Sequence, residues 1–381
     1  MDIRKKILIV NNILQGGGVE KLMYDLVWYW HEQYDITVMT NYSDDAFEQL
    51  YPDNVKYINA YPDKVKNEQL LTKVISKINQ KIHYKKLEKM LNTGTFDIVI
   101  AIKEGWKMLE VSKLNIPVKY CWVHTDYNNY YYTQGIFESA EQELECMKKF
   151  TGIVCVSEDI KKSIIDVIGD PGNLCVKYNP IDIELVKKKA SELLVDVEQT
   201  PKAGVTRFVT VGRLNYQKGF DLLLEACHML EKDGLKFEVW IVGGEEPWGD
   251  EHNRLYRAQK RLKLESVKFI GGRSNPYKYM KAADWFISSS IFEGYSLVSQ
   301  EAAVLGIPML LTECSGVKEL LGDSEYGIVM ESSVIGIYEG MKRVIEEPGI
   351  HDYYKQKIKE RKSIIEYEGR IREIEQLWCE K

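Results

Sequence analysis

The chain has 381 residues, of which 45% are hydrophobic and 28% charged, a composition typical of a folded, water-soluble protein. The length exceeds what one hydrophobic core usually supports, so two domains are expected. The formal net charge of -6 argues against a nucleic-acid-binding protein, because such proteins usually carry an excess of Lys and Arg.

The N-terminus and the cysteines both favour a cytoplasmic protein. The apolar stretch that follows Lys6 is too short for a signal-peptide core or a membrane span. The seven cysteines show no Cys-x-x-Cys pairing and lie mostly in apolar runs, which fits reduced thiols.

Short apolar runs alternate with longer segments of helical period, the pattern of βαβ units around a parallel sheet. The expected strands of the first half are Lys6 to Val10, Asp35 to Thr40, Val55 to Ala60, Phe96 to Ile102, Val118 to Val123, Gly152 to Ser157 and Leu174 to Tyr178. Those of the second half are Arg207 to Val211, Phe237 to Gly243, Val267 to Ile270, Trp285 to Ser289, Pro308 to Thr312 and Gly327 to Met330. The predicted fold class is therefore α/β, with two doubly wound Rossmann-like domains.

A break in this alternation marks the expected domain boundary. Residues 196–206 are polar and lack an apolar period. Ligands of doubly wound sheets bind beyond the carboxyl ends of the strands, so the two sheets are expected to share a cleft. The predicted organisation is an N-terminal domain over 1–195, the linker 196–206, a C-terminal domain over 207–349, and a helical segment over 350–381 that packs back towards the N-terminal domain.

Three consecutive glycines, Gly16, Gly17 and Gly18, follow the first strand and precede a helix. Glycines there let the backbone approach a ligand, and the N–H groups at a helix start suit a phosphate or a sugar hydroxyl. The spacing matches neither a dinucleotide fingerprint nor a P-loop. A plain flexible turn is the alternative interpretation.

A pair of cations follows the first strand of the second half. Arg213 comes two residues after that strand, and Lys218 comes just before the helix that Gly219 opens. An arginine fork, a lysine charge and a helix N-terminus together suit a diphosphate. Solvated surface residues are the alternative.

A carboxylate pair follows the strand Trp285 to Ser289. If Ser296 opens a helix, the neighbours of Glu301 at three and four residues are all apolar, so its carboxylate lies on a buried stripe. Burial costs several kcal/mol without hydrogen-bond partners, and ribose hydroxyls are suitable partners. Backbone N–H groups or a lysine could also satisfy it. Glu293, at the strand exit, is expected to project towards a sugar.

His124 ends a strand of the first half, which places it at the expected ligand-binding edge. Its neighbours Asp126 and the tyrosine-rich run from Tyr127 to Tyr132 are candidate contacts of an acceptor molecule. A structural role for His124 is the alternative.

These residues together resemble the large retaining glycosyltransferase family 4, which has the GT-B architecture, and the resemblance covers nearly the whole chain. Its most specific element is Glu293-x7-Glu301, followed by Gly306-Ile307-Pro308. Supporting elements are Val211-Gly212-Arg213 with Lys218-Gly219, Val242-Gly243-Gly244, and Ala282-Ala283-Asp284.

The resemblance implies that the chain transfers a hexose or N-acetylhexosamine from a nucleotide-sugar to a glycan or lipid-linked glycan in polysaccharide biosynthesis. It implies that Arg213 and Lys218 hold the donor diphosphate, that Glu301 binds the ribose, and that Glu293 and His124 lie at the transferred sugar. The backbone N–H groups of Tyr295, Ser296 and Leu297 would contact the phosphates. The loop Gly16 to Gly18 would face donor and acceptor. The loop Gly271 to Tyr277 looks like that of UDP-sugar users. One departure is Asn179-Pro180, where many members have Gly after the Asn.

Neither a metal nor another cofactor is expected, because the sequence has no Asp-x-Asp and no His/Cys cluster. Cations and helix N-termini would instead neutralise the departing diphosphate. A nucleotide-sugar epimerase or hydrolase, or a catalytically silent binding module, could use the same fold.

The segment Lys64 to Met90 carries eight lysines and two glutamates, interleaved with Leu, Ile and Val. Such a basic amphipathic helix can lie on an anionic membrane surface, which would suit a peripheral enzyme on the cytoplasmic face. The alternative is a solvated helix packed on its own domain.

Overall fold

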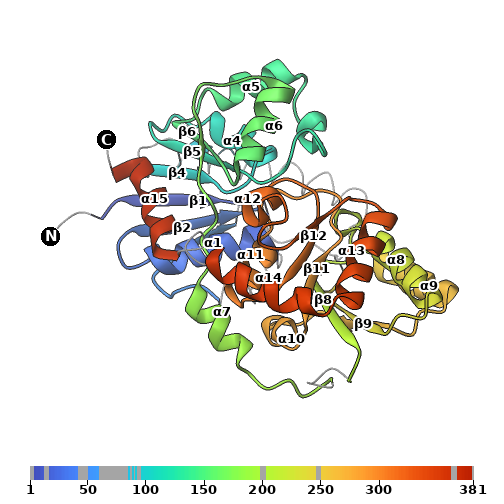
Figure 1. Ribbon diagram of the computed structural model, residues 1–381. Helices are drawn as coiled ribbons and strands as arrows, with labels where there is room; N and C mark the ends of the chain where they lie inside the picture. The colour runs from blue at the N-terminus through green and yellow to red at the C-terminus, as the bar shows by residue number, and fades with distance from the viewer. Residues whose placement is uncertain are drawn as a thin grey trace, which may run out of the picture. The chain divides into compact units, whose positions relative to one another are not determined.

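The computed structural model describes residues 4–12, 17–41, 50–59, 85, 88–89, 91, 96–197, 203–245, 250–361 and 367–379. The chain forms two compact units, one of Met1–Tyr178 with Glu373–Lys381 and the other of Asn179–Arg372. Each unit contains one parallel β-sheet, drawn in blue to green for the first and in yellow-green to orange for the second (Figure 1).

The described part of the first unit has a seven-stranded sheet of order β3-β2-β1-β4-β5-β6-β7. Its strands are β1 (Lys6–Val10), β2 (Asp35–Thr40), β3 (Lys56–Asn59), β4 (Ile98–Ala101), β5 (Lys119–Val123), β6 (Gly152–Cys155) and β7 (Leu174–Val176). Its helices are α1 (Gly18–Trp30), α4 (Trp106–Ser112), the 3-10 turn η1 (Tyr132–Gly135), α5 (Ala140–Met147) and α6 (Glu158–Ile168). The central strands are continuous apolar runs because helices cover both faces of such a sheet.

The second unit has, among its described residues, a six-stranded sheet of order β10-β9-β8-β11-β12-β13. Its strands are β8 (Thr206–Val211), β9 (Phe237–Val242), β10 (Val267–Gly271), β11 (Trp285–Ser288), β12 (Met309–Thr312) and β13 (Ile328–Met330). Its helical elements are α7 (Ile183–Ala190), η2 (Tyr216–Lys218), α8 (Phe220–Lys232), α9 (Glu251–Leu262), α10 (Tyr277–Lys281), α11 (Leu297–Val304), α12 (Val317–Leu321), α13 (Val334–Glu346) and α14 (Gly349–Glu360). The last helix, α15 (Tyr367–Cys379), begins in this unit and ends in the first.

Strand order reverses beside the first strand of each sheet. β1 lies between β2 and β4, and β8 lies between β9 and β11. Val10 at the end of β1 pairs with Ala101 at the end of β4, so the two strands end side by side. Ligands of open parallel sheets bind at such a switch point, beyond the carboxyl ends of the strands.

The predicted fold class is confirmed, and every predicted strand is present. Their ends differ from the predicted ones by at most two residues, as where Phe96 to Ile102 is reduced to Ile98–Ala101. Where an apolar run continues past the last ladder pair, as in β4, hydrophobicity alone overestimates strand length.

The division between the units lies after Tyr178, earlier in the chain than the predicted linker at 196–206. Hydrogen bonds explain the difference. The Asn275 side-chain amide donates to the Lys189 carbonyl at 2.8 Å, and the Tyr279 hydroxyl donates to Asp196 at 2.6 Å. These bonds attach α7 and the segment after it to the second unit, although that segment lacks periodic apolar residues.

The end of the C-terminal segment belongs to the first unit. The Trp378 ring lies 5.2 Å from that of Trp30 and 5.8 Å from that of Tyr120, measured between centroids. The Lys5 ammonium group donates to the Trp378 carbonyl at 3.0 Å. Aromatic packing of this kind anchors the end of α15 on α1, which carries Trp30, and on β5, which carries Tyr120.

Candidate active site

A lysine and a glutamate meet at the switch point of the second sheet. Lys218 follows β8 and donates to Oε1 of Glu293, which follows β11, at 2.5 Å. Ser290 donates to the same oxygen at 2.8 Å, and Gln217 donates to Oε2 at 3.3 Å. Three donors thus hold the Glu293 carboxylate, which is 8% exposed, in one orientation.

Backbone contacts join the two loops that carry this pair. Gly219 has φ of 57°, and a Cβ there would lie 2.1 Å from the Ser289 carbonyl oxygen. The Ile291 amide donates to the Gln217 carbonyl at 2.8 Å, and the Ser289 hydroxyl donates to the Lys218 carbonyl at the same distance. Only glycine fits a left-handed position at such a close approach, so Gly219 fixes where α8 begins.

Arg213 lies two residues after β8, on the same loop as Lys218, and its side chain is exposed. Lys218 directly precedes Gly219, the residue that caps the N-terminus of α8. The predicted order of strand, Arg213, Lys218 and helix N-terminus is therefore present. The described hydrogen bonds to the Glu293 carboxylate come from Lys218, Gln217 and Ser290 rather than from Arg213.

Glu301 lies on α11 and is 4% exposed. Its Oε1 accepts a hydrogen bond from the Tyr277 hydroxyl at 2.9 Å. The predicted burial is present, but α11 buries a run of consecutive residues, Ser299 to Val304, rather than one apolar stripe. A tyrosine of α10, which sequence reasoning did not connect with Glu301, donates this hydrogen bond.

The segment from Tyr295 to Leu297 forms the start of α11. Ser296 accepts from the Ser299 amide at 3.4 Å and caps the helix. The Tyr295 ring is 5% exposed, and a Cβ at Gly316 would lie 2.4 Å from it. The backbone of this segment is thus held by a buried ring and a capping hydroxyl, beside Glu293.

Arg370, near the start of α15, is a candidate site residue that the sequence analysis missed. It is 5% exposed, and its guanidinium group donates to the Asn179 carbonyl at 2.5 Å and to the Gln300 side chain at 2.6 Å. It also lies 6.0 Å from the centroid of the Tyr295 ring. Arg370 therefore holds α11 in place through its hydrogen bond to Gln300, one residue before Glu301. No local motif marks it, because its partners are far away in the sequence.

The predicted loop for the nucleotide, Gly271 to Tyr277, connects β10 to α10. Gly271 has φ of 80°, a left-handed turn that favours glycine. Arg273 forms an ion pair with Asp196 at 3.0 Å, and Tyr277 at the end of the loop binds Glu301. The loop is therefore linked directly to the carboxylate that is predicted to hold the ribose.

In the first unit, Gly17 is the N-cap of α1 in an extended conformation and Gly18 is the first helical residue. Gly16 lies outside the described residues. The part of the glycine loop that the structure describes thus opens a helix, as predicted.

His124 follows β5 and is oriented by two hydrogen bonds. Its Nε2 lies 2.8 Å from the Ile102 carbonyl oxygen, and its backbone amide donates to Glu104 Oε2 at 3.1 Å. A carbonyl oxygen only accepts, so Nε2 carries the proton and Nδ1 is left as an acceptor in the neutral ring. Burial lowers the pKa of His124, which favours this neutral form.

The two predicted acceptor contacts lie in different surroundings from those expected. Asp126 is 3% exposed and accepts from the Asn128 amide at 2.8 Å. The Tyr127 hydroxyl donates to Glu143 at 2.7 Å, and Tyr127 is 2% exposed. The predicted acceptor role of Tyr127 is at odds with this burial, because its polar group is bonded inside the unit. Residue type and position at a strand end did not reveal which way the ring points.

The predicted basic helix, Lys64 to Met90, lies outside the described residues apart from Lys85, Glu88 and Lys89. No helix that the structure describes has both the length and the apolar content needed to cross a bilayer. Among the same residues, no group of three or more His, Cys, Asp and Glu side chains could hold a metal ion.

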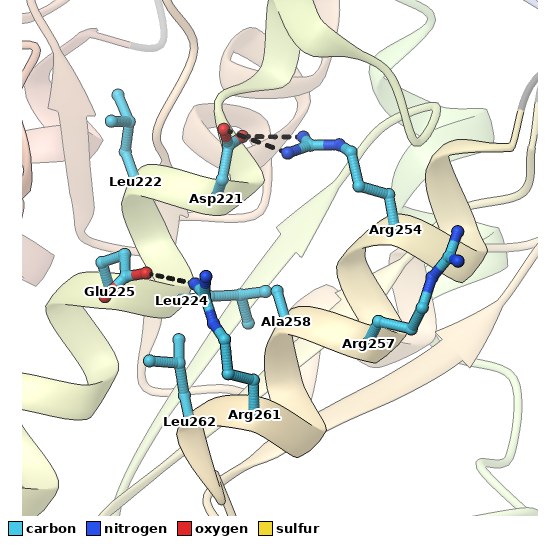
Figure 2. A pocket seen from close by; sticks show the side chains of 9 residues that line it. All are labelled: Asp221, Leu222, Leu224, Glu225, Arg254, Arg257, Ala258, Arg261 and Leu262. Carbon is cyan, nitrogen blue, oxygen red and sulfur yellow. Dashed lines mark hydrogen bonds and ion pairs between the residues drawn. The ribbon is translucent and has the colours of Figure 1, made fainter.

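A hollow of about 420 Å³ lies between α8 and α9 (Figure 2). Arg254 pairs with Asp221 at 3.2 Å and Arg261 with Glu225 at 2.8 Å across it. Since these carboxylates neutralise the two arginines, the hollow offers little attraction for a phosphate. None of the predicted donor residues lines it.

Solved structures of other proteins share the fold of this chain. Anabaena Alr3699/HepE, in complex with UDP and glucose, aligns with a TM-score of 0.80 at 17% identity, covering 99% of this chain and 100% of that one. Sucrose-phosphate synthase from Thermosynechococcus elongatus aligns with a TM-score of 0.76 at 15% identity, covering 99% of each. Two parallel α/β units in this arrangement of strands define the GT-B fold of glycosyltransferases.

Two family models match the two halves of the sequence. Residues 16–185 match Glycosyltransferase Family 4, and residues 195–367 match Glycosyl transferases group 1. Between them these matches cover most of the chain, which belongs to glycosyltransferase family 4.

Two curated relatives are named as transferases of a sugar. A Campylobacter jejuni N-acetylgalactosamine-N,N'-diacetylbacillosaminyl-diphospho-undecaprenol 4-alpha-N-acetylgalactosaminyltransferase is 34% identical over 49% of this chain and 48% of its own length. An Escherichia coli UDP-Gal:alpha-D-GlcNAc-diphosphoundecaprenol alpha-1,3-galactosyltransferase is 23% identical over 79% of this chain and 77% of its own. The chain thus spans about half the length of the first relative and about three quarters of the second.

Proposed function

We propose that this protein transfers a hexose or N-acetylhexosamine, with retention of anomeric configuration, from a UDP-sugar to a lipid-linked glycan in the biosynthesis of a cell-surface polysaccharide. The observation that carries the proposal is the Lys218–Glu293 ion pair at the switch point of the second sheet. Glu301, buried on the helix that follows, provides a second carboxylate. A cation for a diphosphate and carboxylates for hydroxyl groups are the chemistry that a nucleotide-sugar requires.

In the proposed reaction the bond between the sugar C1 and the diphosphate oxygen breaks, and a bond from C1 to the acceptor oxygen forms on the same face. The acceptor proton passes to the departing phosphate oxygen. Lys218, Arg213 and the N–H groups at the starts of α8 and α11 stabilise the charge that develops on the diphosphate. Glu301 binds the ribose, while Glu293 and the acceptor atom Nδ1 of His124 bind the sugar.

The assignments of donor and stereochemistry rest on resemblance. The Gly271 to Tyr277 loop looks like that of UDP-sugar users, and the E. coli relative is named for a UDP-sugar. Both relatives described above are named for alpha linkages, and retention gives an alpha product from an alpha-linked donor.

The assignment of the acceptor rests on the relatives, whose names specify sugars on diphospho-undecaprenol. A glycan carried on such a lipid lies at a membrane surface. We propose that the basic segment Lys64 to Met90 binds anionic lipid there, on the cytoplasmic face. Binding to vesicles that contain anionic lipid at low salt, lost at high salt, supports this arrangement, whereas no binding at either salt concentration rules it out.

We propose that the reaction needs no metal, since cations of the chain neutralise the leaving group. Turnover that survives EDTA supports this view, and turnover that requires added Mg²⁺ or Mn²⁺ contradicts it.

A screen of UDP-, GDP- and ADP-sugars for hydrolysis, followed by transfer to a glycolipid and NMR of the new linkage, tests the whole proposal. The expected result is turnover of a UDP-sugar and an alpha product. Incubation without acceptor separates the alternatives, since an epimerase would yield the epimeric nucleotide-sugar or the free epimer. A catalytically silent module would bind UDP in calorimetry without any turnover.

A further inference from the structure

We infer that Lys103, Tyr130 and Tyr132 form a binding site for a sugar diphosphate, the head of a lipid-linked glycan acceptor. This inference rests on the proposed function, and the three residues are called the tyrosine–lysine site below.

The tyrosine–lysine site lies beyond the carboxyl ends of two neighbouring strands. Lys103 comes two residues after β4, and Tyr130 and Tyr132 lie in the segment after β5. β4 is one of the two strands that form the switch point of the first sheet. Because ligands of open parallel sheets bind at this edge, the location alone favours a binding function.

The tyrosine-rich run divides into two pairs with opposite surroundings. The hydroxyl groups of Tyr127 and Tyr131 both donate to the buried Glu143, at 2.7 and 2.8 Å. Tyr130 and Tyr132 instead stack on each other, with centroids 6.0 Å apart and planes 18° from parallel. The first pair anchors the loop, so the second pair is presented by a fixed support.

A hydrogen bond fixes the Tyr132 side chain, whereas the Tyr130 side chain is half exposed to solvent. The Tyr132 hydroxyl donates to the Glu104 carbonyl at 3.0 Å, and a Cβ at Gly105 would lie 3.2 Å from the same hydroxyl. Tyr130 is 50% exposed. A flat aromatic face that is already ordered loses little entropy on binding, and sugar rings pack their C–H groups against such faces.

A cation lies beside the stacked rings. The Lys103 ammonium group is 5.5 Å from the centroid of the Tyr132 ring. Within the part of the chain that the structure describes, no carboxylate forms an ion pair with Lys103. A lysine without a partner carboxylate, next to an aromatic surface, suits a ligand that has an apolar face and an attached phosphate.

Glu104, the residue after Lys103, has a buried carboxylate oxygen that lacks a hydrogen-bond partner among the described residues. Glu104 is 1% exposed, and its Oε1 has no hydrogen-bond partner among the described residues. Its Oε2 accepts from the His124 amide. A buried polar atom without a partner costs free energy, and a sugar hydroxyl of the ligand would satisfy it after a small movement of the side chain.

The test uses N-acetylglucosaminyl-diphospho-geraniol, a short version of the acceptor named for the E. coli relative, and geranyl N-acetylglucosaminide, which lacks the diphosphate. Calorimetry measures the affinity of the full-length protein for each probe and for UDP. We expect Tyr130→Ala to weaken binding of both probes about tenfold, and Tyr130→Phe to bind them nearly as well as wild type. Lys103→Gln should weaken only the probe that carries the diphosphate.

Two control variants match these changes. Tyr353→Ala removes a tyrosine of α14 that is 53% exposed and contacts Tyr354, and Lys149→Gln removes an exposed lysine of the first unit. Unchanged probe affinity in both controls, and UDP affinity unchanged throughout, is the expected pattern. The inference is overturned if Tyr130→Phe loses as much affinity as Tyr130→Ala, or if Lys103→Gln matches Lys149→Gln. It is also overturned if wild-type protein binds UDP but neither probe, whereas failure to bind UDP contradicts the proposed function itself.

Discussion

Lys218 donates to Glu293 at 2.5 Å, although 75 positions separate the two residues in the sequence. A cation that is predicted to hold the diphosphate and a carboxylate that is predicted to hold the sugar are therefore partners of each other. Each keeps the other oriented and compensates its charge in a largely buried position. A donor molecule bound beside this pair would meet a site that is already ordered, which lowers the cost of binding.

Variants of the two residues should separate their roles. We expect Lys218→Ala to weaken UDP binding and to lower kcat/KM about a hundredfold, because it removes a cation from the leaving group. Glu293→Gln should lower kcat while UDP affinity changes little, since its partner in the substrate is the sugar. Calorimetry with UDP and initial rates with the UDP-sugar measure both effects. Lys357→Ala, which breaks the Lys357–Glu360 pair on α14, is the matched control, and turnover of Lys218→Ala at the control rate would refute the assignment.

Glu301 should contribute to affinity through the ribose. A charge-assisted hydrogen bond contributes roughly 1.5–3 kcal/mol, so Glu301→Gln should weaken UDP binding about tenfold or more. The loss should be smaller for 2′-deoxy-UDP, which lacks one of the hydroxyl groups. Tyr277→Phe, which removes the hydroxyl that donates to Glu301, should have a weaker effect on both ligands. An equal loss for UDP and 2′-deoxy-UDP would show that Glu301 does not bind the 2′-hydroxyl.

Arg370 should matter for both stability and donor binding. Arg370→Ala leaves the Asn179 carbonyl and the Gln300 side chain without their donor, so we expect a loss of about 2–4 kcal/mol in the free energy of unfolding. The KM for the donor should rise because α11, which carries Glu301, loses the hydrogen bond between Arg370 and Gln300. Arg370→Lys should recover part of both effects. Arg372→Ala on the same helix, whose exposed side chain pairs with Glu368, is the control, and urea titration with equal results for Arg370→Ala and Arg372→Ala would contradict the prediction.

Tyr127→Phe distinguishes a structural tyrosine from an acceptor contact. It removes a buried donor to Glu143, so we expect the protein to lose about 1–3 kcal/mol of stability. The KM for the glycan acceptor should stay unchanged, because the ring is buried. Thermal unfolding and acceptor kinetics provide the two readouts. A raised acceptor KM with unchanged stability would reinstate the role expected from the sequence.

His124 should make stability depend on pH. Burial lowers its pKa, so the folded protein takes up this proton less readily than the unfolded chain, in which a histidine titrates near about 6.5. The unfolded chain therefore binds more protons as the pH falls through this range, and the folded form loses stability. We expect the Tm to fall further between about pH 7 and about pH 5 in wild type than in His124→Gln, whose amide can still donate to Ile102. Parallel Tm curves for the two proteins would count against a neutral, buried His124.

Local sequence patterns predicted the sheets well because each parallel strand is a short apolar run buried on both faces. They also located Glu301, since a carboxylate among apolar neighbours needs a partner whatever the fold. The two compact units divide after Tyr178, before the predicted linker, for a related reason. The segment after α7 looks like a linker in composition, yet Asp196 bonds to Arg273 and Tyr279 in the second unit.

Tertiary structure decided which polar groups become partners. Arg370 and Asn179 are 191 positions apart, and nothing near either residue in the sequence indicates the other. Neighbouring tyrosines likewise have the same side chain but opposite surroundings, since Tyr131 reaches Glu143 while Tyr130 remains half exposed.

The sequence by itself thus determined the two parallel sheets and the polar residues that follow their strands, because periodic burial is a local property of the chain. The Lys218–Glu293 pair, the Tyr277 partner of Glu301 and the stacked pair Tyr130 and Tyr132 were decided only when strands and helices packed together. The physical reason is that a hydrogen bond depends on distance and direction in space, which the packing of remote segments sets.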